Sequence, residues 1–246
     1  MAEPVDLSRD IAELTPGVIA LRRALHQHQG LAFEEVWTAA TLAARMRDLG
    51  LTVRERIGVT GVVATLDGAR PGRTLLVRAE MDGLPMKDET SRGYASMFDN
   101  RSHSCGHDAH AAIVAGVAEV LVRHRERFAG RIAFVFQPAD EPMRGAKRMI
   151  EDGLLEWVSP DMSLSVHVLP MAPAGEVVIQ RGPIWASWDT RILTIVGPPP
   201  PSGAQSTFDI ARVAAQVTTA LYDLVEREGI SRSTPVDANG RPCSGV

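Results

Sequence analysis

The sequence predicts an α/β domain in which helices cover both faces of a sheet. Segments with helical spacing of apolar residues alternate along the chain with short apolar runs bounded by glycine. Three of these short runs, 74–79, 132–136 and 162–166, lead into acidic or histidine residues. Functional groups gather at the carboxyl ends of strands in open α/β sheets. The 246 residues, 45% of them hydrophobic, suffice for a sizeable core.

Amphipathic periodicity predicts five helices. The first has apolar residues at Leu14, Val18, Leu21 and Leu25; we expect it to start at Thr15 and Pro16 and to end near Gly30. The second covers residues 36–49, and the third covers residues 109–123 with Asp108 as its cap. The spacing also predicts a short helix over 145–152 and an amphipathic helix from 210 to near 229.

Short apolar runs predict the strands, which we place at 51–57, 61–66, 74–79, 132–136, 162–168, 175–180 and 188–196. The run of four prolines within residues 197–203 cannot continue a strand ladder and marks a compositional break. Residues 230–246 have no periodicity, and we expect them to fray.

Composition excludes several classes of protein. Lys and Arg total 26 against 30 Asp and Glu, and the net charge of −4 provides no basic field for nucleic acid. The longest apolar runs are far shorter than the roughly 20 residues that span a bilayer, so we expect no membrane segment. Two cysteines cannot form a disulfide framework, and the amino terminus lacks a basic and apolar leader. We therefore expect a cytoplasmic protein.

One loop and two strand ends combine residues that bind metals. Cys105 and His107 are separated by a single glycine, so a tight backbone can direct both side chains to one point. Glu141 and His167 can reach that point from neighbouring strand ends. Sulfur, nitrogen and oxygen ligands together suit zinc, manganese, cobalt or nickel rather than calcium or magnesium. Asp140 is then placed to take a proton from water that the metal activates.

Each of these residues alone has a plainer interpretation. A single cysteine is usually a small buried residue, a single histidine a structural one, and an adjacent acid pair a solvated turn. Glu80 and Asp82 could be caps, and His103 and His110 could be either structural or orienting residues. A hydrolase with Cys105 as nucleophile and His107 as base is a further alternative, although no separate Asn or Asp to orient the base is evident.

The sequence around these residues resembles a known family of metal-dependent amidohydrolases. The family includes hippurate hydrolases, N-acyl-amino-acid amidohydrolases and plant hydrolases of auxin conjugates. The resemblance extends from Leu21-Arg-Arg-Ala-Leu-His26 to Arg181-Gly-Pro183. Its most specific motifs are Arg78-Ala-Glu-Met-Asp-Gly-Leu-Pro85, His103-Ser-Cys-Gly-His-Asp-Ala-His110 and Phe136-Gln-Pro-Ala-Asp-Glu141.

This resemblance implies a site, a fold and a reaction. Cys105, His107, Glu141 and His167 would bind one or two divalent transition metal ions, Mn or Zn with Co or Ni as alternatives. Asp140 would be the general base. Residues 1–182 would form the amino-terminal part of a zinc-exopeptidase-like catalytic domain, and residues 183–246 part of an α+β lid that also makes a homodimer. The substrate would be an N-acyl amino acid or a similar small amide.

The sequence departs from the family pattern in four ways. Glu80 replaces an aspartate, and Asp140 replaces a glutamate and is shorter by about 1.5 Å. Four prolines replace a lid histidine that helps to bind the reacting carbonyl, and no closing histidine ligand follows the lid. We therefore expect a weak second metal position and slow hydrolysis by the 246-residue chain. The alternative is a catalytically silent relative that acts as a binding or interaction protein.

Overall fold

The computed structural model describes residues 6–179, 193–197 and 209–227. Contacts between residues divide the chain into two compact units, Met1–Pro170 and Met171–Val246. The domain boundary predicted between residues 182 and 183 lies outside the described residues, as do the proline run and the tail from residue 230.

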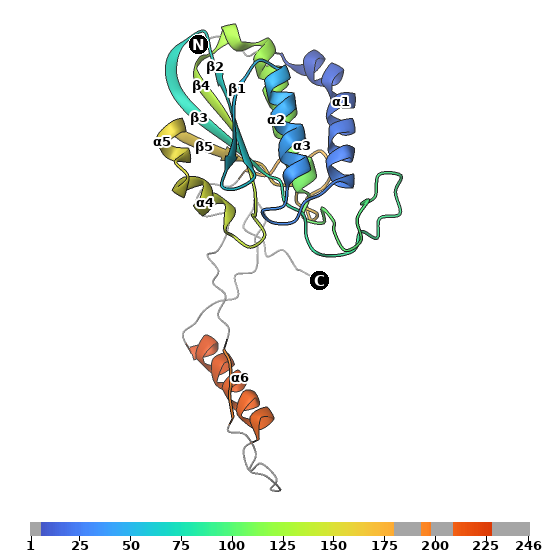
Figure 1. Cartoon of the computed structure of the whole chain (residues 1–246), viewed down its shortest axis with the longest axis vertical. Coiled ribbons are helices and arrows are strands. Elements are labelled where there is room, and N and C mark those ends of the chain that lie inside the picture. Colours follow the sequence, from blue (N-terminus) through green and yellow to red (C-terminus); the bar gives the residue numbers. More distant parts are fainter. Residues whose placement is uncertain (1–5, 180–192, 198–208, 228–246) are drawn as a thin grey trace. The chain divides into compact units, whose positions relative to one another are not determined.

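The first unit contains a five-stranded mixed sheet (Figure 1). Its strands are β1 (Thr52–Ile57), β2 (Gly61–Asp67), β3 (Arg70–Glu80), β4 (Ala129–Gln137) and β5 (Met162–Ser165), in the order β1-β2-β4-β3-β5. The β1–β2 and β2–β4 pairs are antiparallel, whereas β3 is parallel to both β4 and β5. The carboxyl ends of β4, β3 and β5 therefore meet at one edge of the sheet.

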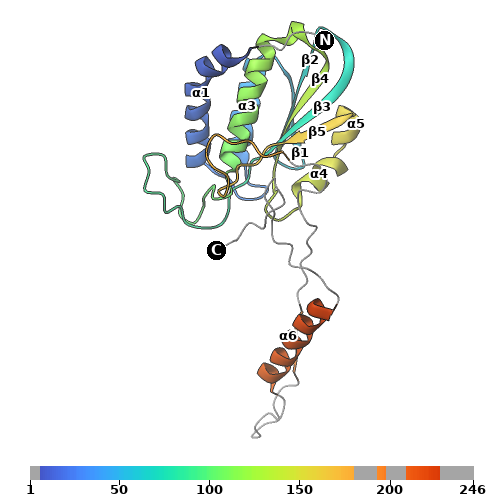
Figure 2. The same ribbon diagram turned by 180° about the vertical axis from the view of Figure 1, so that it is seen from behind.

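Helices cover both faces of this sheet, as the sequence predicts (Figures 1 and 2). One face carries α1 (Ser8–Gln27), α2 (Val36–Asp48) and α3 (His107–Arg123), and the other carries α4 (Gly145–Glu151) and α5 (Leu154–Val158). Side chains of β4 alternate between the two cores, because successive residues of a strand point to opposite faces. Phe134 and Phe136 belong to the core beneath the long helices, whereas Val135 packs with Met149 and Leu154 on the other side.

The start of α1 differs from the prediction. Thr15 and Pro16 do not begin the helix; Pro16 lies inside it, and the Thr15 hydroxyl donates a hydrogen bond to the Ile11 carbonyl at 2.6 Å. Contacts with α3 hold the turns before the proline, since Asp10 lies 2.7 Å from Nε2 of His124. Tertiary contacts thus outweigh the local signal of a proline in the first turn.

The start of α3 also corrects the prediction. The helix begins at His107 rather than at residue 109, and Gly106 precedes it with a φ of +88°. Asp108 does not cap the helix. Its buried carboxylate lies 2.7 Å from Nε of Arg22 and 2.8 Å from Nδ1 of His26, so it ties α3 to α1.

The predicted strands after β4 are shorter than expected or missing. The strand predicted over 162–168 ends at Ser165. Residues 175–179 form no strand; Gly175 has a φ of +90° in a turn, and no described segment pairs with the apolar residues after it. Residues 193–196 are likewise outside any strand, and the rest of that predicted strand lies outside the described residues. An apolar run forms a strand only where a neighbouring strand pairs with it, and the composition of the run does not show whether such a neighbour exists.

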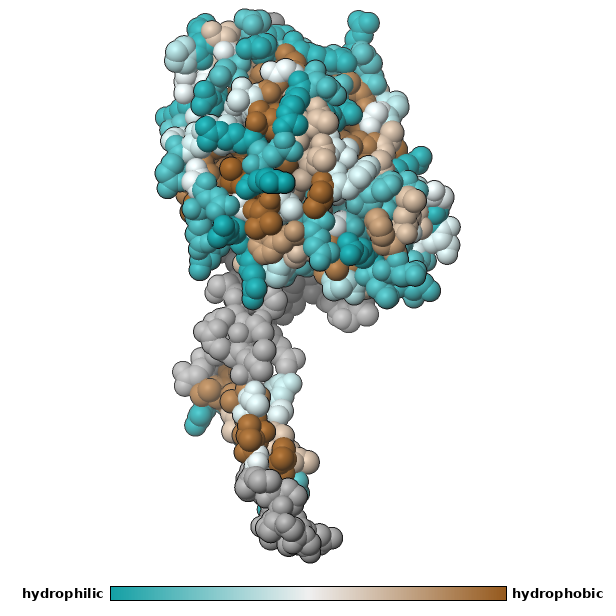
Figure 3. Space-filling view, viewed as in Figure 1, coloured by the Kyte–Doolittle hydropathy of each residue, from teal (hydrophilic) through white to brown (hydrophobic). Residues whose placement is uncertain are grey.

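In the second unit, α6 (Ile210–Arg227) matches the predicted amphipathic helix. None of its side chains is buried, and brown apolar residues are visible along it in Figure 3. The large exposed apolar side chains are Ile210, Leu221, Tyr222, Leu224 and Val225. Among the described residues, no helix is both long and apolar enough to cross a membrane.

Candidate metal centre

The predicted site lies where the carboxyl ends of three parallel strands meet the amino end of α3. Asp82 follows β3, Asp140 and Glu141 follow β4, and His167 follows β5. Cys105 comes from the loop that leads into α3, and His107 is the first residue of that helix. This arrangement agrees with the expectation that strand ends converge on the cysteine-containing loop.

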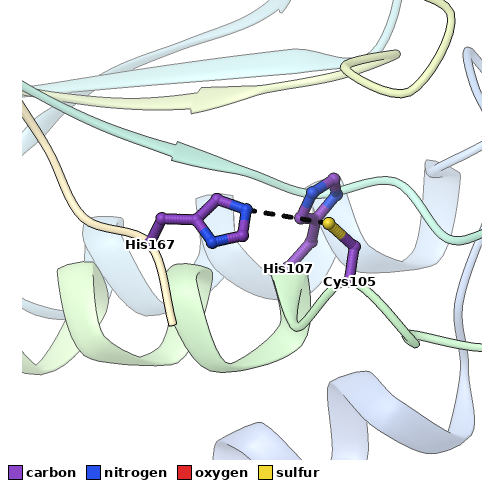
Figure 4. A group of neighbouring side chains, drawn as sticks. All are labelled: Cys105, His107 and His167. Atoms are coloured by element: carbon purple, nitrogen blue, oxygen red, sulfur yellow. Dashed lines mark hydrogen bonds between the residues drawn. The ribbon is translucent and has the colours of Figure 1, made fainter. Parts of the chain in front are cut away.

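Cys105, His107 and His167 form the centre of this group (Figure 4). Their ligand atoms all lie within 4.8 Å of one another, and Cys105 Sγ is 3.6 Å from His167 Nε2. Gly106 is required between the first two, because its φ is positive and a Cβ there would collide with Val168. A thiol and two imidazoles therefore face one small volume.

Two carboxylates complete the group. Oδ2 of Asp140 and Oε1 of Glu141 each lie 3.9 Å from Nε2 of His107. All five residues selected from the sequence are thus neighbours in the structure. Three of the proposed ligands are partly or largely shielded from solvent, whereas His167 is exposed.

Asp82 orients the candidate ligands, a role that the sequence alone left open. Nδ1 of His107 lies 3.0 Å from Oδ1 of Asp82 and 2.9 Å from the Asp82 carbonyl oxygen. Since both neighbours are acceptors, this nitrogen carries the proton, and Nε2 presents a lone pair to the centre. The second Asp82 oxygen accepts the backbone N–H of Glu141 at 3.0 Å. Such outer partners are typical of metal-binding histidines.

Two buried polar atoms at this centre have no hydrogen-bond partner, and a bound cation would satisfy both of them. Nε2 of His107 and Oε1 of Glu141 are both buried without a hydrogen bond. Leaving such groups unpaired costs on the order of 1–3 kcal/mol each. Sulfur, nitrogen and carboxylate oxygen donors together suit a divalent transition metal ion. The residues present therefore fit the group that the sequence predicts.

The electrostatics of the site favour a positive charge. Burial, followed by the negative charges of Glu141 and Asp140, raises the pKa of the Cys105 thiol to about 12. The pKa of His107 is also raised: burial lowers it, but the hydrogen bond and charge of Asp82 outweigh that effect. Without a cation the thiol is protonated at neutral pH, so the alternative of a cysteine nucleophile finds no support here.

Arg78 is a site residue that the sequence analysis missed. It lies two residues before Glu80 on β3, so both side chains point to the same face of the sheet. Its guanidinium forms ion pairs with Glu80 and with Oδ1 of Asp140, and its Nε donates to Gln137 at 2.8 Å. Gln137 in turn donates to Asp140 at 3.1 Å. The period-two pattern around Glu80 was the signal that could have found it.

His103, whose role the sequence left open, is buried in the structure with both ring nitrogens lacking hydrogen-bond partners. Burial lowers its pKa from 6.5 to about 4. The unfolded chain thus binds a proton at this residue from about pH 6.5 downward, whereas the folded chain does so only near pH 4.

Acidification from pH 7 to pH 4.5 is therefore expected to reduce the free energy of unfolding, with His103 contributing up to about 3 kcal/mol. Denaturant unfolding at several pH values, with a chelator present, measures this effect. His103→Gln should flatten the pH dependence. An equally steep dependence in His103→Gln would show that other groups cause the acid instability.

Comparison with known proteins identifies the class to which this fold and site belong. The sequence pattern of peptidase family M20/M25/M40 matches residues 76–243. The chain therefore belongs to this family.

Three relatives illustrate the similarity. The chain is 33% identical over 226 residues to thermostable carboxypeptidase 1 of Saccharolobus solfataricus, covering 90% of this chain and 57% of that protein. It is 34% identical over 225 residues to an N-acyl-L-amino acid amidohydrolase of Geobacillus stearothermophilus, covering 90% of this chain and 60% of the relative. A crystal structure of the YXEP protein of Bacillus subtilis, described as a dinuclear metal-binding M20 peptidase, aligns with a TM-score of 0.67.

That structural alignment has 32% sequence identity and covers 70% of this chain and 48% of the other. The chain thus spans between about half and three fifths of the lengths of these relatives. Family membership and the fold of the first unit follow directly from these comparisons.

Proposed function

We propose that this chain carries the metal-binding half-site of a hydrolase that cleaves the amide bond of N-acyl amino acids or similar small amides. One observation carries the proposal: a thiol, two imidazoles and a carboxylate converge, and a second carboxylate lies beside them. The similarity to an amidohydrolase of N-acyl-L-amino acids supports this substrate class.

The proposed ligands are Cys105, His107, Glu141 and His167. One or two ions of manganese or zinc, with cobalt or nickel as alternatives, suit this donor set. When bound, such an ion polarises the amide carbonyl and lowers the pKa of water. Asp82 keeps the ligands oriented, because it binds both the ring of His107 and the backbone of Glu141.

Asp140 is the proposed general base. Arg78 and Gln137 both hold its Oδ1 atom, so the carboxylate is fixed in one orientation and Oδ2 faces the ligand group. We assign to Oδ2 the acceptance of a proton from the attacking water. The same oxygen then returns that proton to the nitrogen of the leaving amino acid.

Release of free amino acid from N-acyl amino acids tests this function. N-benzoylglycine and N-acetyl amino acids are incubated with manganese- or zinc-loaded protein in excess over substrate, so that slow cleavage is also detected. A dipeptide with a free amino group is included to distinguish amidohydrolase from peptidase activity. We expect release of the amino acid that depends on both the metal and Asp140.

Asp140→Asn is the matched control, because it keeps the shape of the side chain but not its basicity. Metal-loaded protein that releases no product under these conditions would favour the alternative, a catalytically silent relative that acts as a binding or interaction protein. If Asp140→Asn released as much amino acid as the wild type, Asp140 would not be the general base.

We also propose a homodimer formed through residues 183–246 and a cytoplasmic location. The exposed apolar side chains of α6 support the homodimer, since large apolar surfaces mark interfaces. Sedimentation equilibrium tests the dimer: a monomer at all concentrations would contradict it. The content of only two cysteines supports the cytoplasmic location.

A further inference from the structure

We infer that His110 is a positioning residue that, together with Glu80, fixes the segment carrying His167. This inference deepens the proposed function, because His167 is one of the proposed metal ligands. His110 lies on α3 three residues after His107, so both rings are on the same side of the helix. Its side chain is completely buried.

Both ring nitrogens of His110 are occupied by hydrogen bonds. The backbone N–H of Val168 donates to Nε2 at 2.9 Å, and because an N–H can only donate, this nitrogen carries no proton. The proton is therefore on Nδ1, which lies 2.8 Å from Oε2 of Glu80. A single neutral tautomer satisfies both bonds. His107 differs, because its Nε2 has no hydrogen-bond partner.

The hydrogen bond from the Val168 N–H to His110 holds the backbone next to His167, beyond the last residue of β5 that pairs with the sheet. β5 ends at Ser165, so the residues that follow have no strand partner in the described part of the chain. Val168 is the next residue after His167, and its side chain packs against Gly106 of the cysteine loop. The rings of His110 and His167 also contact each other, with centroids 4.4 Å apart. His110 thus restrains both the backbone and the ring of the proposed ligand.

Glu80 fixes His110 from the other side. It is 2% exposed, and its two carboxylate oxygens have different partners: Oε1 pairs with Arg78, and Oε2 pairs with His110. Arg78 also pairs with Asp140. A continuous set of contacts, buried at Glu80 and His110 and partly exposed at Arg78 and Asp140, therefore connects the proposed base to the segment that carries His167.

Glu80, His107 and His110 also have ligand atoms within 4.8 Å of one another, so a metal site at these three residues is the competing explanation. The two hydrogen bonds of His110 argue against it, because metal binding at Nε2 would require the Val168 N–H to lose its acceptor. The two explanations predict different results for variants of His110.

The first measurement is hydrogen exchange of the Val168 amide in the metal-free 246-residue chain. His110→Ala should increase its exchange rate at least tenfold, whereas His110→Gln, which can present an acceptor near the position of Nε2, should recover part of the protection. His124→Ala is the control: this residue also pairs with a carboxylate, that of Asp10, but it follows the carboxyl end of α3, whereas the site lies at the amino end of that helix. Unchanged exchange in His110→Ala would overturn the inference.

The second measurement is Co²⁺ affinity, determined by competition with a chelator, together with the absorption spectrum of the complex. Loss of an orienting partner typically costs 10–100-fold in metal affinity. We expect a loss in that range for His110→Ala, partial rescue by His110→Gln and a larger loss for His167→Ala. Equal losses in His110→Ala and His167→Ala without rescue by glutamine would make His110 a ligand and overturn the inference.

Failure of the proposed function is distinguishable from failure of this inference. If the wild-type chain binds no Co²⁺, the proposed metal site fails. The exchange rate of the Val168 amide still decides whether His110 holds the segment, since that measurement needs no metal. Circular dichroism of each variant verifies that a change in exchange does not reflect global unfolding.

Discussion

His107→Ala is expected to weaken binding of Mn²⁺ or Zn²⁺ by more than about 100-fold, the upper range for loss of an orienting partner alone. The structural reason is that Nε2 of His107 lies at the centre of the group, within 3.9 Å of both Asp140 and Glu141. Elemental analysis after loading and dialysis measures the bound metal. His28→Ala, at the end of α1, is the control and should bind as much metal as the wild type.

Thermodynamic linkage provides an independent measurement of the same effect. At a free metal concentration of 100 times Kd, binding to the native state should raise the free energy of unfolding of the wild type by about 2.7 kcal/mol. His107→Ala should show no such increase at that concentration. If the metal stabilised the wild type and His107→Ala equally, the ion would bind at a site that does not include His107.

Substitutions of Asp140 are expected to have the second large effect, this time on the rate. Removal of a general base typically lowers a rate by 10²–10⁴-fold, and we expect Asp140→Asn to fall in that range. Asp140→Glu should instead increase the rate. Oδ2 of Asp140 is 3.9 Å from His107 Nε2, and a side chain longer by about 1.5 Å brings the carboxylate nearer to the ligand group.

A misplacement of about 1 Å can cost on the order of 100-fold, so the gain from Asp140→Glu can reach that size. Single-turnover rates on N-benzoylglycine, compared at equal metal content, measure it. A rate that is unchanged or lower in Asp140→Glu would indicate that Arg78 and Gln137 have adapted the site to the shorter acid. It would also be the expected result if Asp140 were not the base.

Much of this fold and site could be predicted from the sequence because the signals are local. The apolar runs that became β3 and β4 are continuous enough to identify buried strands, and ligand-type residues follow each of them directly. The spacing of Cys105 and His107 depends on one glycine between them. These features required no knowledge of distant contacts.

Other features depend on partners far away in the sequence. Asp108 looked like a helix cap, but Arg22 and His26 of α1 take its carboxylate instead. The roles of Arg78 and Asp82 arise only when β3 lies beside β4 and the cysteine loop. A one-dimensional pattern identifies a group that can pair, but not the group with which it pairs.

The central claim is that Cys105, His107, Glu141 and His167 share one metal centre, and Co²⁺ titration monitored by absorption tests it most directly. Binding should produce a thiolate-to-cobalt charge-transfer band together with ligand-field bands. Cys105→Ser should lose the charge-transfer band, and His167→Ala should change the ligand-field bands while keeping it. A wild-type chain that binds no Co²⁺, or a Cys105→Ser spectrum identical to that of the wild type, would contradict the account.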